Sequence, residues 1–419
     1  MIYRIAILFS LFVLLDIYVW MGTRNAFGSG NLNTFYKWFF WVSSAISYVG
    51  FAVLFVVFRD RSTSPVIWQN FLMGFAFTFF VFKLLTGVFL MIDDLIRFFQ
   101  YLVESISSLF SSKSTKDIDL HDRRRFIVQT GIILASIPFA SMLFGITKGK
   151  YWYKLKNVTL NYKNLPSAFK GLKVIHISDV HSGSFDSYDD VARGIKMIND
   201  QNPDLILFTG DLVNNKADEI VPYISLFQGL KAKYGKFSTL GNHDYGDYVK
   251  WDSDVAKEQN MQDLYKNHRS MGFDLLNNEN RKIQIQESHI NLVGVENWGR
   301  PPFPQHGDLN KALTGVAPEE FKILMSHDPS HWDMEVLEHD CPVELTLSGH
   351  THGMQFGIEI PGWKWSPVKY VYKNWAGLYE KMNQKLYVNR GFGFLGFPGR
   401  VGMWPEITVI ELDNESSEA

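Results

Sequence analysis

The chain has 419 residues, of which 46% are hydrophobic and 20% are charged, and its formal net charge is −2. This length corresponds to about two or three domains, and the near-neutral balance argues against a nucleic-acid-binding protein, which typically carries a strongly basic domain. The single cysteine, Cys341, excludes an intrachain disulfide framework and a cysteine-based zinc site. The charges are unevenly distributed, because only twelve fall within the first 111 residues.

Four apolar stretches fill the front third of the chain, at residues 2–21, 35–58, 68–92 and 126–146. Each is close to the roughly 20 residues that a helix needs to cross the hydrocarbon core of a bilayer. Aromatic and basic residues flank these stretches, as is typical of membrane interfaces. We therefore predict transmembrane helices within residues 1–111 (three spans and an amphipathic segment), a polar linker at residues 112–125 and a fourth span at residues 126–147.

Two charged residues, Asp16 and Lys83, lie inside the predicted spans. A charge buried in a membrane without a partner costs several kcal/mol, so such residues face the interior of a helix bundle. Asp16 lies near the end of its helix and can face the interior of the bundle without a charged partner. An ion pair between Asp16 and Lys83 is the other interpretation.

The basic residues around the last span bear on the orientation in the membrane. Three arginines at residues 123–125 directly precede this span, which favours a cytoplasmic start and an extracytoplasmic C-terminal domain. Four lysines between residues 148 and 156 follow it and favour the opposite orientation. The sequence thus predicts an integral protein of a plasma or inner membrane, with a preference for an extracytoplasmic C-terminal domain.

Residues 156–413 alternate short apolar runs with polar, helix-like segments, which is typical of an α/β domain. Helices are predicted at residues 188–201 and 220–230. Strands are predicted at residues 172–178, 205–209, 236–240, 283–286, 290–295, 322–325, 344–347, 385–389 and 406–412. Strands that alternate with helices form parallel units, and the strand-rich second half predicts a second sheet with antiparallel strands. Residues 414–419 form a polar tail.

Polar side chains that can bind metals follow five of these strands. Ligands of open α/β sheets bind at the carboxyl ends of strands, and small residues let the backbone turn there. The five segments are Ser178–Gly183, Gly210–Asp211, Gly241–Asp244, Ser326–Pro329 and Ser348–Gly353. Their Asp, Asn and His side chains offer oxygen and nitrogen donors without a thiolate, a set that suits Mn, Fe, Zn or Mg. Two such ions would need about seven ligands, with at least one shared.

With these five segments in this order, residues 172–412 resemble the calcineurin-like metallophosphoesterases. The upstream apolar helices and the C-terminal segments Tyr387–Gly393 and Trp404–Ile407 resemble the membrane-anchored branch of that family. The resemblance implies an α/β fold in which N-terminal transmembrane helices precede a two-sheet α/β/β/α metallophosphoesterase domain. Met354 departs from the branch, which usually has a glycine at this position.

The resemblance also implies two divalent metal ions and identifies their ligands. One ion would be held by Asp179, His181, Asp211 and His352. The other would be held by Asp211, Asn242, His327 and His350. Asp211 would therefore bridge the two ions.

A pair of divalent ions lowers the pKa of a shared water and polarises a phosphoryl group, so the expected reaction is the hydrolysis of a phosphate ester or anhydride. His243 adjoins Asn242 and is not assigned to a metal, so we expect it to protonate the leaving oxygen. Asp244 would orient the His243 ring, or else cap a helix. Arg390 and Arg400 would clamp a substrate phosphate, or else serve ion pairs.

The expected function is that of a membrane-anchored phosphoesterase that cleaves a phosphodiester or pyrophosphate bond, with a lipid-linked compound as substrate. One alternative is hydrolysis of the pyrophosphate of UDP-2,3-diacylglucosamine in lipid A synthesis, which would require a cytoplasmic active site. A second alternative is a non-catalytic membrane sensor that binds phosphate. The aromatic and basic segment at residues 361–375 suits a lipid headgroup interface, or else packs as an ordinary loop.

Overall fold

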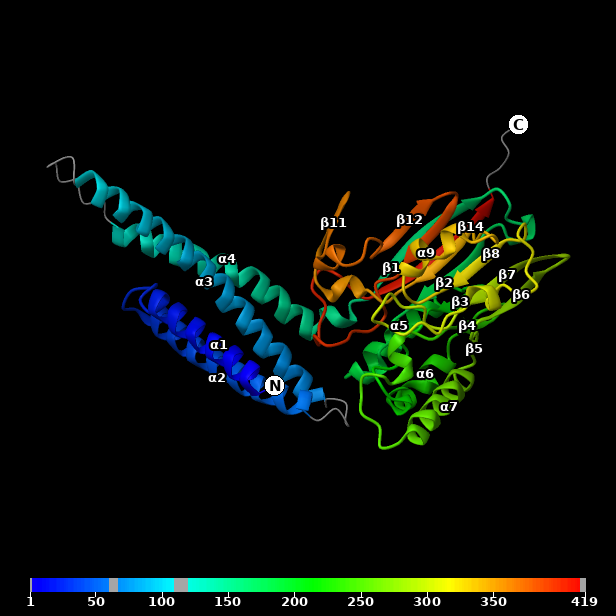
Figure 1. Ribbon diagram of the computed structural model, residues 1–419, viewed down its shortest axis with the longest axis horizontal. Helices are drawn as coiled ribbons and strands as arrows, with labels where there is room; N and C mark the ends of the chain where they lie inside the picture. The colour runs from blue at the N-terminus through cyan, green and yellow to red at the C-terminus, as the bar shows by residue number, and fades with distance from the viewer. Residues whose placement is uncertain (1, 60–66, 109–119, 415–419) are drawn as a thin grey trace. The chain divides into compact units, whose positions relative to one another are not determined.

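The computed structural model describes residues 2–59, 67–108 and 120–414 and divides the chain into two compact units (Figure 1). Of the described residues, the first unit contains 2–59, 68–108 and 120–144, and the second contains Ile67 and residues 145–414. Residues 112–119 of the predicted polar linker and all but the first residue of the predicted tail, at residues 415–419, lie outside the described residues. Residues 120–125 of that predicted linker instead form the beginning of helix α4 (Leu120–Thr147).

The first unit is built from helices α1 (Ile2–Thr23), α2 (Asn31–Arg59), α3 (Ile67–Ser108) and α4 (Leu120–Thr147). The predicted third span and most of the amphipathic segment that follows it form one continuous helix, α3. Within the described residues, Trp68–Ile106 and Arg123–Thr147 are long and apolar enough to cross a membrane, and α1 carries a shorter apolar stretch, Phe9–Thr23.

These helices bury many polar side chains and leave many large apolar side chains exposed. Ser44 and Thr86 are buried, whereas Leu14 and Trp38 are 60% and 69% exposed. In water the opposite arrangement is favoured, because apolar surface is removed from the solvent on folding. An apolar outer surface around polar contacts is the pattern expected of helices that face lipid.

The two charged residues inside the predicted spans form an ion pair. Lys83 Nζ lies 2.9 Å from Asp16 Oδ1, and both side chains are buried. Lys83 also donates a hydrogen bond of 2.8 Å to Ser44 Oγ, and the Tyr48 hydroxyl donates one of 2.9 Å to Asp16 Oδ2. The pair therefore links α1, α2 and α3 through a compensated buried charge.

Replacing only one partner of this pair is expected to destabilise the helix bundle strongly. Lys83→Met leaves the Asp16 carboxylate buried without a counter-ion, which costs about 3–5 kcal/mol in buried pairs. The double variant Asp16→Asn, Lys83→Met removes both charges and should recover much of that loss. Unfolding of the full chain in detergent, followed by helical content, measures both; equal stabilities of the single and double variants would contradict the prediction.

The second unit contains two six-stranded sheets. The first has the order β1 (Lys154–Tyr162), β14 (Glu406–Asn414), β2 (Leu172–Ile177), β3 (Leu205–Phe208), β4 (Lys236–Ser238) and β5 (Asp274–Leu275). The second has the order β12 (Gly377–Lys381), β13 (Gln384–Val388), β9 (Leu345–Ser348), β8 (Lys322–Met325), β7 (Ser288–Gly294) and β6 (Glu279–Ile285). β2 to β5 are parallel, as are β7, β8, β9 and β13.

The two sheets pack face to face, and helices cover their outer faces. Val174 and Leu207 of the first sheet share a buried cluster with Leu292 and Ile323 of the second. Their neighbours along the strands point the other way, because side chains alternate between the faces of a sheet. The outer cluster of the first sheet includes residues of α5 (Tyr188–Asn199) and α7 (Asp254–Ser270), and that of the second includes Trp332 of α9 (Ser330–Met334). The predicted α/β/β/α architecture is confirmed.

Several elements of this unit were absent from the sequence prediction, among them α7 and β1. α7 is rich in polar residues, and only a few positions such as Leu264 face the core, so its apolar period is weak. β1 begins two residues before the predicted domain start and pairs with β14 from the far end of the chain. That pairing joins segments about 250 residues apart, which no local pattern reports.

Candidate metal centre

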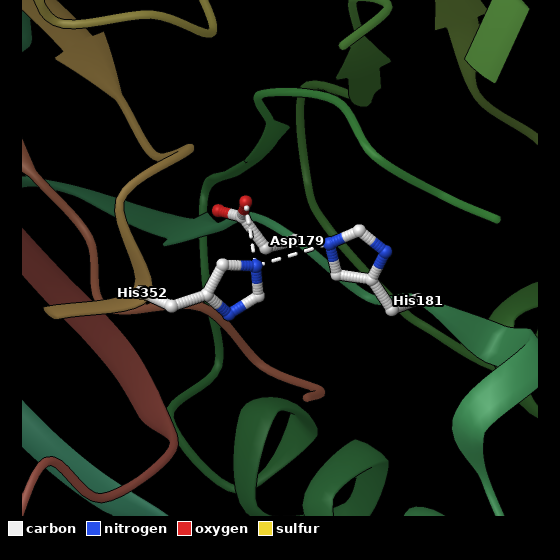
Figure 2. Close-up of side chains that lie close together, drawn as sticks. All are labelled: Asp179, His181 and His352. Atoms are coloured by element: carbon white, nitrogen blue, oxygen red, sulfur yellow. Dashed lines mark hydrogen bonds and ion pairs between the residues drawn. The ribbon is translucent and has the colours of Figure 1, made fainter. Parts of the chain in front are cut away.

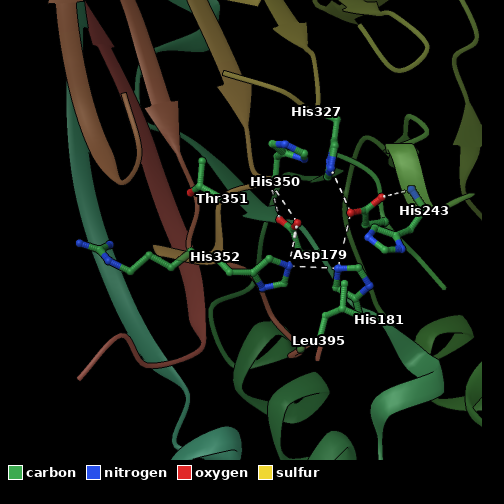
Figure 3. A network of polar contacts seen from close by, with 12 residues as sticks. Asp179, His181, His243, His327, His350, Thr351, His352 and Leu395 are labelled. Carbon is green, nitrogen blue, oxygen red and sulfur yellow. Dashed lines mark hydrogen bonds and ion pairs between the residues drawn. The ribbon is translucent and has the colours of Figure 1, made fainter. Parts of the chain in front are cut away.

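The five segments singled out in the sequence meet at one edge of the two-sheet core (Figure 3). They follow β2, β3 and β4 of the first sheet and β8 and β9 of the second. Because these strands are parallel within each sheet, their carboxyl ends lie at a common edge. Side chains from both sheets therefore converge on one place.

The backbone turns sharply at most of these positions. Positive φ angles between 47° and 68° occur at Asp179, His181, Asp211, His350 and His352. This left-handed region is unfavourable for residues with a Cβ atom, and such strain is concentrated at functional sites. It turns successive side chains into the space between the strand ends.

The first group of donors consists of Asp179, His181 and His352 (Figure 2). The Nε2 atom of His352 lies 3.0 Å from Nε2 of His181 and 3.2 Å from Oδ1 of Asp179. Ligand atoms bonded to one zinc-sized ion at about 2.0–2.2 Å are themselves separated by roughly 3.0–3.5 Å. All three side chains are buried, so the group has the spacing and the shielding of a metal site.

The second group consists of Asp211, His327 and His350. Nδ1 of His327 donates a hydrogen bond of 2.7 Å to the Thr209 carbonyl, which leaves its Nε2 directed at Asp211 Oδ2, 3.1 Å away. The same carboxylate oxygen lies 3.5 Å from Nε2 of His181 in the first group. Asp211 is thus the residue that lies between the two groups.

Asn242 completes the set. Its Nδ2 donates a hydrogen bond of 2.8 Å to the Tyr248 hydroxyl, while its Oδ1 is buried without a hydrogen-bond partner among the described residues. Buried acceptors are normally satisfied, and an amide oxygen is a good ligand for a hard cation. The orientation of this side chain therefore fits a metal ligand.

The electrostatics of the site favour the ligand forms of most of these side chains. Burial raises the pKa of Asp179, but His352 and His327 outweigh it and hold that pKa well below its ordinary value. Burial also lowers the pKa of His181 and His350, which keeps both rings neutral. His327 differs: burial lowers its pKa, but Asp211 raises it to about 10. A histidine binds a metal through a ring nitrogen that has lost its proton. A cation at this position would therefore take the place of the His327 proton beside Asp211.

Comparison with known proteins identifies the family. A model described as "Probable Calcineurin-like phosphoesterase, transmembrane domain" matches residues 2–150, and one described as "Calcineurin-like phosphoesterase" matches residues 172–354. The uncharacterized metallophosphoesterase YkuE of Bacillus subtilis is 32% identical over 260 residues, which cover 61% of this chain and 83% of that protein. The chain belongs to the calcineurin-like metallophosphoesterases.

Two other relatives have names that mention a membrane location or a substrate. The transmembrane protein with metallophosphoesterase domain of Danio rerio is 29% identical over 289 residues, covering 67% of this chain and 62% of that protein. The chain therefore spans less than two thirds of that relative's length. The UDP-2,3-diacylglucosamine pyrophosphatase LpxG of Chlamydia trachomatis is 27% identical over 289 residues, covering 57% of this chain and 84% of that protein. With a matching transmembrane domain, this phosphoesterase is a membrane protein.

His243 of this phosphoesterase lies at the edge of the metal centre, but Asp244 does not orient it. Nδ1 of His243 donates a hydrogen bond of 2.7 Å to the Asn214 carbonyl. The Asp244 carboxylate instead accepts hydrogen bonds of 2.8–2.9 Å from the backbone N–H groups of Gly241, Asp211 and Leu212. The prediction that Asp244 orients the ring is wrong, because this side chain ties together the two loops that carry Asp211 and Asn242. Burial and the nearby Asp211 raise its pKa to about 7.

Neither of the two arginines predicted to bind a substrate phosphate, Arg390 and Arg400, is available to do so. Arg390 forms ion pairs with Glu406 and Glu359, in a cavity separate from the metal pocket. Arg400 is fully buried and donates hydrogen bonds to the carbonyls of Gly393 and Arg390. Both guanidinium groups are committed to the protein, which corresponds to the ion-pair interpretation for Arg390 and corrects the clamp prediction for both.

Arg400 contacts the first donor group through His352. Its Nη2 lies 3.0 Å from Nδ1 of His352, on the side of the ring opposite to the first donor group. Groups behind a metal ligand fix its orientation, and their loss weakens metal binding. This role was missed because Arg400 is 48 residues from His352 and nothing in its local sequence points to that ring.

The metal centre opens into a pocket of about 270 Å³ whose wall is largely apolar. Besides the donors and His243, its lining includes Phe303, Met354, Val368, Val371, Tyr372 and Leu395. Tyr372 also contacts the centre directly, since its hydroxyl lies 2.7 Å from Nε2 of His350. Met354, at the position that departs from the family branch, has a φ of 54° and forms part of this wall.

A methyl group at Gly349 is expected to weaken metal binding without removing a ligand. A Cβ atom at this position would lie 1.9 Å from Ser178 Oγ and 2.2 Å from Asp179 Oδ2, so Gly349→Ala must displace the Asp179 carboxylate. We expect metal affinity to fall by roughly 10- to 100-fold, as when the support of a ligand is lost. Metal titration measures the affinity of this variant and of a control, Gly30→Ala, whose added methyl group meets nothing within 4 Å. Unchanged affinity in Gly349→Ala would contradict it.

Proposed function

We propose that this protein is a membrane-anchored, dinuclear-metal phosphoesterase that hydrolyses a phosphodiester or pyrophosphate bond in a lipid-linked substrate. The observation that carries the proposal is the pair of donor groups joined by Asp211 in one buried centre. Two such groups sharing a carboxylate are the arrangement used for phosphoryl chemistry with two metals.

The ligands proposed for the first ion are Asp179, His181, Asp211 and His352. Those proposed for the second are Asp211, Asn242, His327 and His350. When bound, two divalent cations supply Lewis acidity at the phosphoryl oxygens and lower the pKa of water near them. The oxygen and nitrogen donors are compatible with Mn, Fe, Zn or Mg.

The protein's own contribution to the reaction is proton delivery and exclusion of water. The bond from His243 Nδ1 to the Asn214 carbonyl holds the ring, so that a proton on Nε2 is the one available to a leaving oxygen. The backbone N–H of His243 donates to Asp211 Oδ1 over 2.8 Å, which fixes the distance between this acid and the metal centre. The apolar wall restricts water around the reacting phosphate.

Two features support a lipid-linked substrate. The wall of the metal pocket carries Phe303, Val371 and Leu395, which suit an apolar group close to the phosphate. The chain also carries its own transmembrane domain, which confines the site to the vicinity of a bilayer. The relative in Chlamydia named as a UDP-2,3-diacylglucosamine pyrophosphatase makes that compound a specific candidate.

The orientation in the membrane decides which lipids the site can reach. We propose an extracytoplasmic domain from the arginines at residues 123–125, which directly precede the apolar part of α4. Hydrolysis of UDP-2,3-diacylglucosamine would instead require a cytoplasmic site. Protease accessibility of the C-terminal domain in sealed vesicles distinguishes the two.

The substrate proposal is tested with the purified full chain, stripped of metal by a chelator and then given Mn²⁺. Hydrolysis of bis-p-nitrophenyl phosphate should vanish on stripping and return with the metal. A diacylated diester or pyrophosphate should then be cleaved with a higher kcat/KM than the same compound without acyl chains. Equal values for both would contradict the lipid-linked substrate, and no hydrolysis with any of the four metals would contradict the enzyme itself.

A further inference from the structure

The short hairpin of β10 (Ile358–Ile360) and β11 (Trp363–Trp365) forms a sheet of its own beside the larger ones (Figure 1). Its register pairs Ile358 with Trp365, Glu359 with Lys364 and Ile360 with Trp363. Residues directly opposite each other in an antiparallel pair point to the same side. One face therefore carries Ile358, Ile360, Trp363 and Trp365, and the other carries Glu359 and Lys364.

The charged residues of the hairpin are the ones that contact the rest of the domain. Glu359 Oε1 lies 3.1 Å from Lys156 Nζ and 2.9 Å from Arg390 Nη2. Lys364 donates a hydrogen bond to the Ala376 carbonyl and lies 5.3 Å from the centre of the Trp375 ring. These contacts hold the hairpin to the domain through its polar side chains.

The apolar face is turned outward. Ile358, Ile360 and Trp363 are 51%, 54% and 51% exposed. A two-stranded sheet in water normally shows its polar face to the solvent and buries its apolar face. Apolar side chains gathered on the exposed side of one small hairpin are characteristic of a site of interaction.

This apolar surface continues to the mouth of the metal pocket. The indole N–H of Trp365 lies 3.4 Å from the Tyr370 hydroxyl, which connects the hairpin to the turn at Pro367–Tyr370. Tyr370 and Val371 are 74% and 56% exposed, and Val371 lines the metal pocket. Lys369 and Lys373 are exposed beside them. We call Ile358, Ile360, Trp363, Tyr370 and Val371 the hairpin surface.

The base of the hairpin lies next to residues 145–147, which end helix α4 and belong to the same unit as the hairpin. Val401 exchanges backbone hydrogen bonds with Gln355 and Gly357, at 2.7 and 2.9 Å, directly before β10. The preceding residue, Arg400, donates its backbone N–H to the Gly145 carbonyl in the last turn of α4, at 3.3 Å. A helix that spans a bilayer ends at the membrane surface, so this part of the domain is close to lipid.

Aromatic and basic residues mark the same region. The rings of Trp152 and Trp404 have centroids 5.1 Å apart, and Lys154 Nζ lies 3.7 Å from the Trp152 ring centre. Tryptophan beside lysine, immediately after a spanning helix, is typical of the headgroup level. With Lys369 and Lys373, this composition is complementary to anionic lipid.

We infer that the hairpin surface inserts into the headgroup region of an anionic lipid bilayer, the one crossed by α4. The mouth of the metal pocket then opens at the lipid surface, next to Val371. The inference rests on the arrangement of these side chains and does not depend on the proposed hydrolysis.

The test uses the full chain in lipid nanodiscs of phosphatidylcholine and phosphatidylglycerol, with Cys341 replaced by Ser. Ile360→Cys carries an environment-sensitive fluorophore, and Trp363→Cys is a second position on the same face. The matched control is Val255→Cys on α7, since Val255 is also an exposed apolar side chain, at 78%. Thermal unfolding verifies that all three variants are folded.

The labels at 360 and 363 should show blue-shifted emission and lose intensity when the lipids carry acyl-chain spin labels, whereas the label at 255 should respond only to aqueous iodide. Iodide quenching at 360 equal to that at 255, with no lipid quenching, would overturn the inference. Cross-linking between the 360 positions of two chains, again without lipid quenching, would overturn it in favour of a second copy. An equal response in phosphatidylcholine alone would overturn the assignment to anionic lipid.

Discussion

Replacement of Asp211 by Asn is expected to deprive the protein of metal at both donor groups and to abolish hydrolysis. The Asp211 Oδ2 atom lies 3.1 Å from His327 Nε2 and 3.5 Å from His181 Nε2, so one carboxylate serves both groups. An amide cannot supply the negative charge that two cations share. Because metal-assisted catalysis then fails, and enzymes accelerate reactions by about 10⁶-fold or more, we expect the rate to fall by more than about 10⁴-fold.

Metal content by elemental analysis and hydrolysis of bis-p-nitrophenyl phosphate measure this prediction together. Asp274→Asn is the matched control, because it makes the same chemical change at an exposed carboxylate paired with Arg281, in a different part of the domain. The control should keep its metal and its rate. Two bound metals and an unchanged rate in Asp211→Asn would show that the centre is not the catalytic site.

Replacement of His243 by Ala is expected to lower the rate while both metals remain bound. The His243 ring lies in the pocket lining, and its Nδ1 is held by the Asn214 carbonyl rather than directed toward a donor group. Loss of a positioned general acid costs about 10²–10⁴-fold in rate. The loss should be largest for an alkyl leaving group, which needs a proton, and much smaller for p-nitrophenolate, which does not.

The comparison between these two leaving groups distinguishes proton delivery from a structural role. A structural defect would lower both rates equally and would reduce the metal content as well. His243→Gln is a useful second variant, since its amide can retain a hydrogen bond to the Asn214 carbonyl but cannot act as an acid. If His243→Gln restored the alkyl ester rate, proton delivery by this residue would be wrong.

The sequence predicted the main strands of the second unit well, because these strands are short apolar runs with local signals at both ends. All nine predicted strands are present, and the polar segments that follow five of them supply Asp179, Asp211, Asn242, His327 and the two histidines at 350 and 352. A strand end is a local property, and the parallel pairing of neighbouring strands then brings these ends together. The donors were therefore accessible to sequence reasoning before any tertiary contact was known.

The roles of the charged residues around the centre were not accessible in the same way. Asp244 was expected to hold His243, yet its carboxylate satisfies three backbone N–H groups on two loops. Arg390 and Arg400 were expected to meet a substrate, yet both are buried among protein acceptors. A side chain's partner depends on which distant segment packs against it, and neighbouring residues in the sequence carry no record of that.

By itself, the sequence determined the division into an apolar helical part and an α/β part, the family, and the order of the donor residues, because apolar period and strand-end composition are local. The tertiary structure alone decided that Asp16 pairs with Lys83, since the two residues lie 67 positions apart on different helices. It also decided that Glu359 and Lys364 of the β10–β11 hairpin contact the rest of the domain, whereas Ile358, Ile360 and Trp363 are about half exposed. Alternation fixes which residues share a face, but only packing against the rest of the fold selects the face that is left exposed.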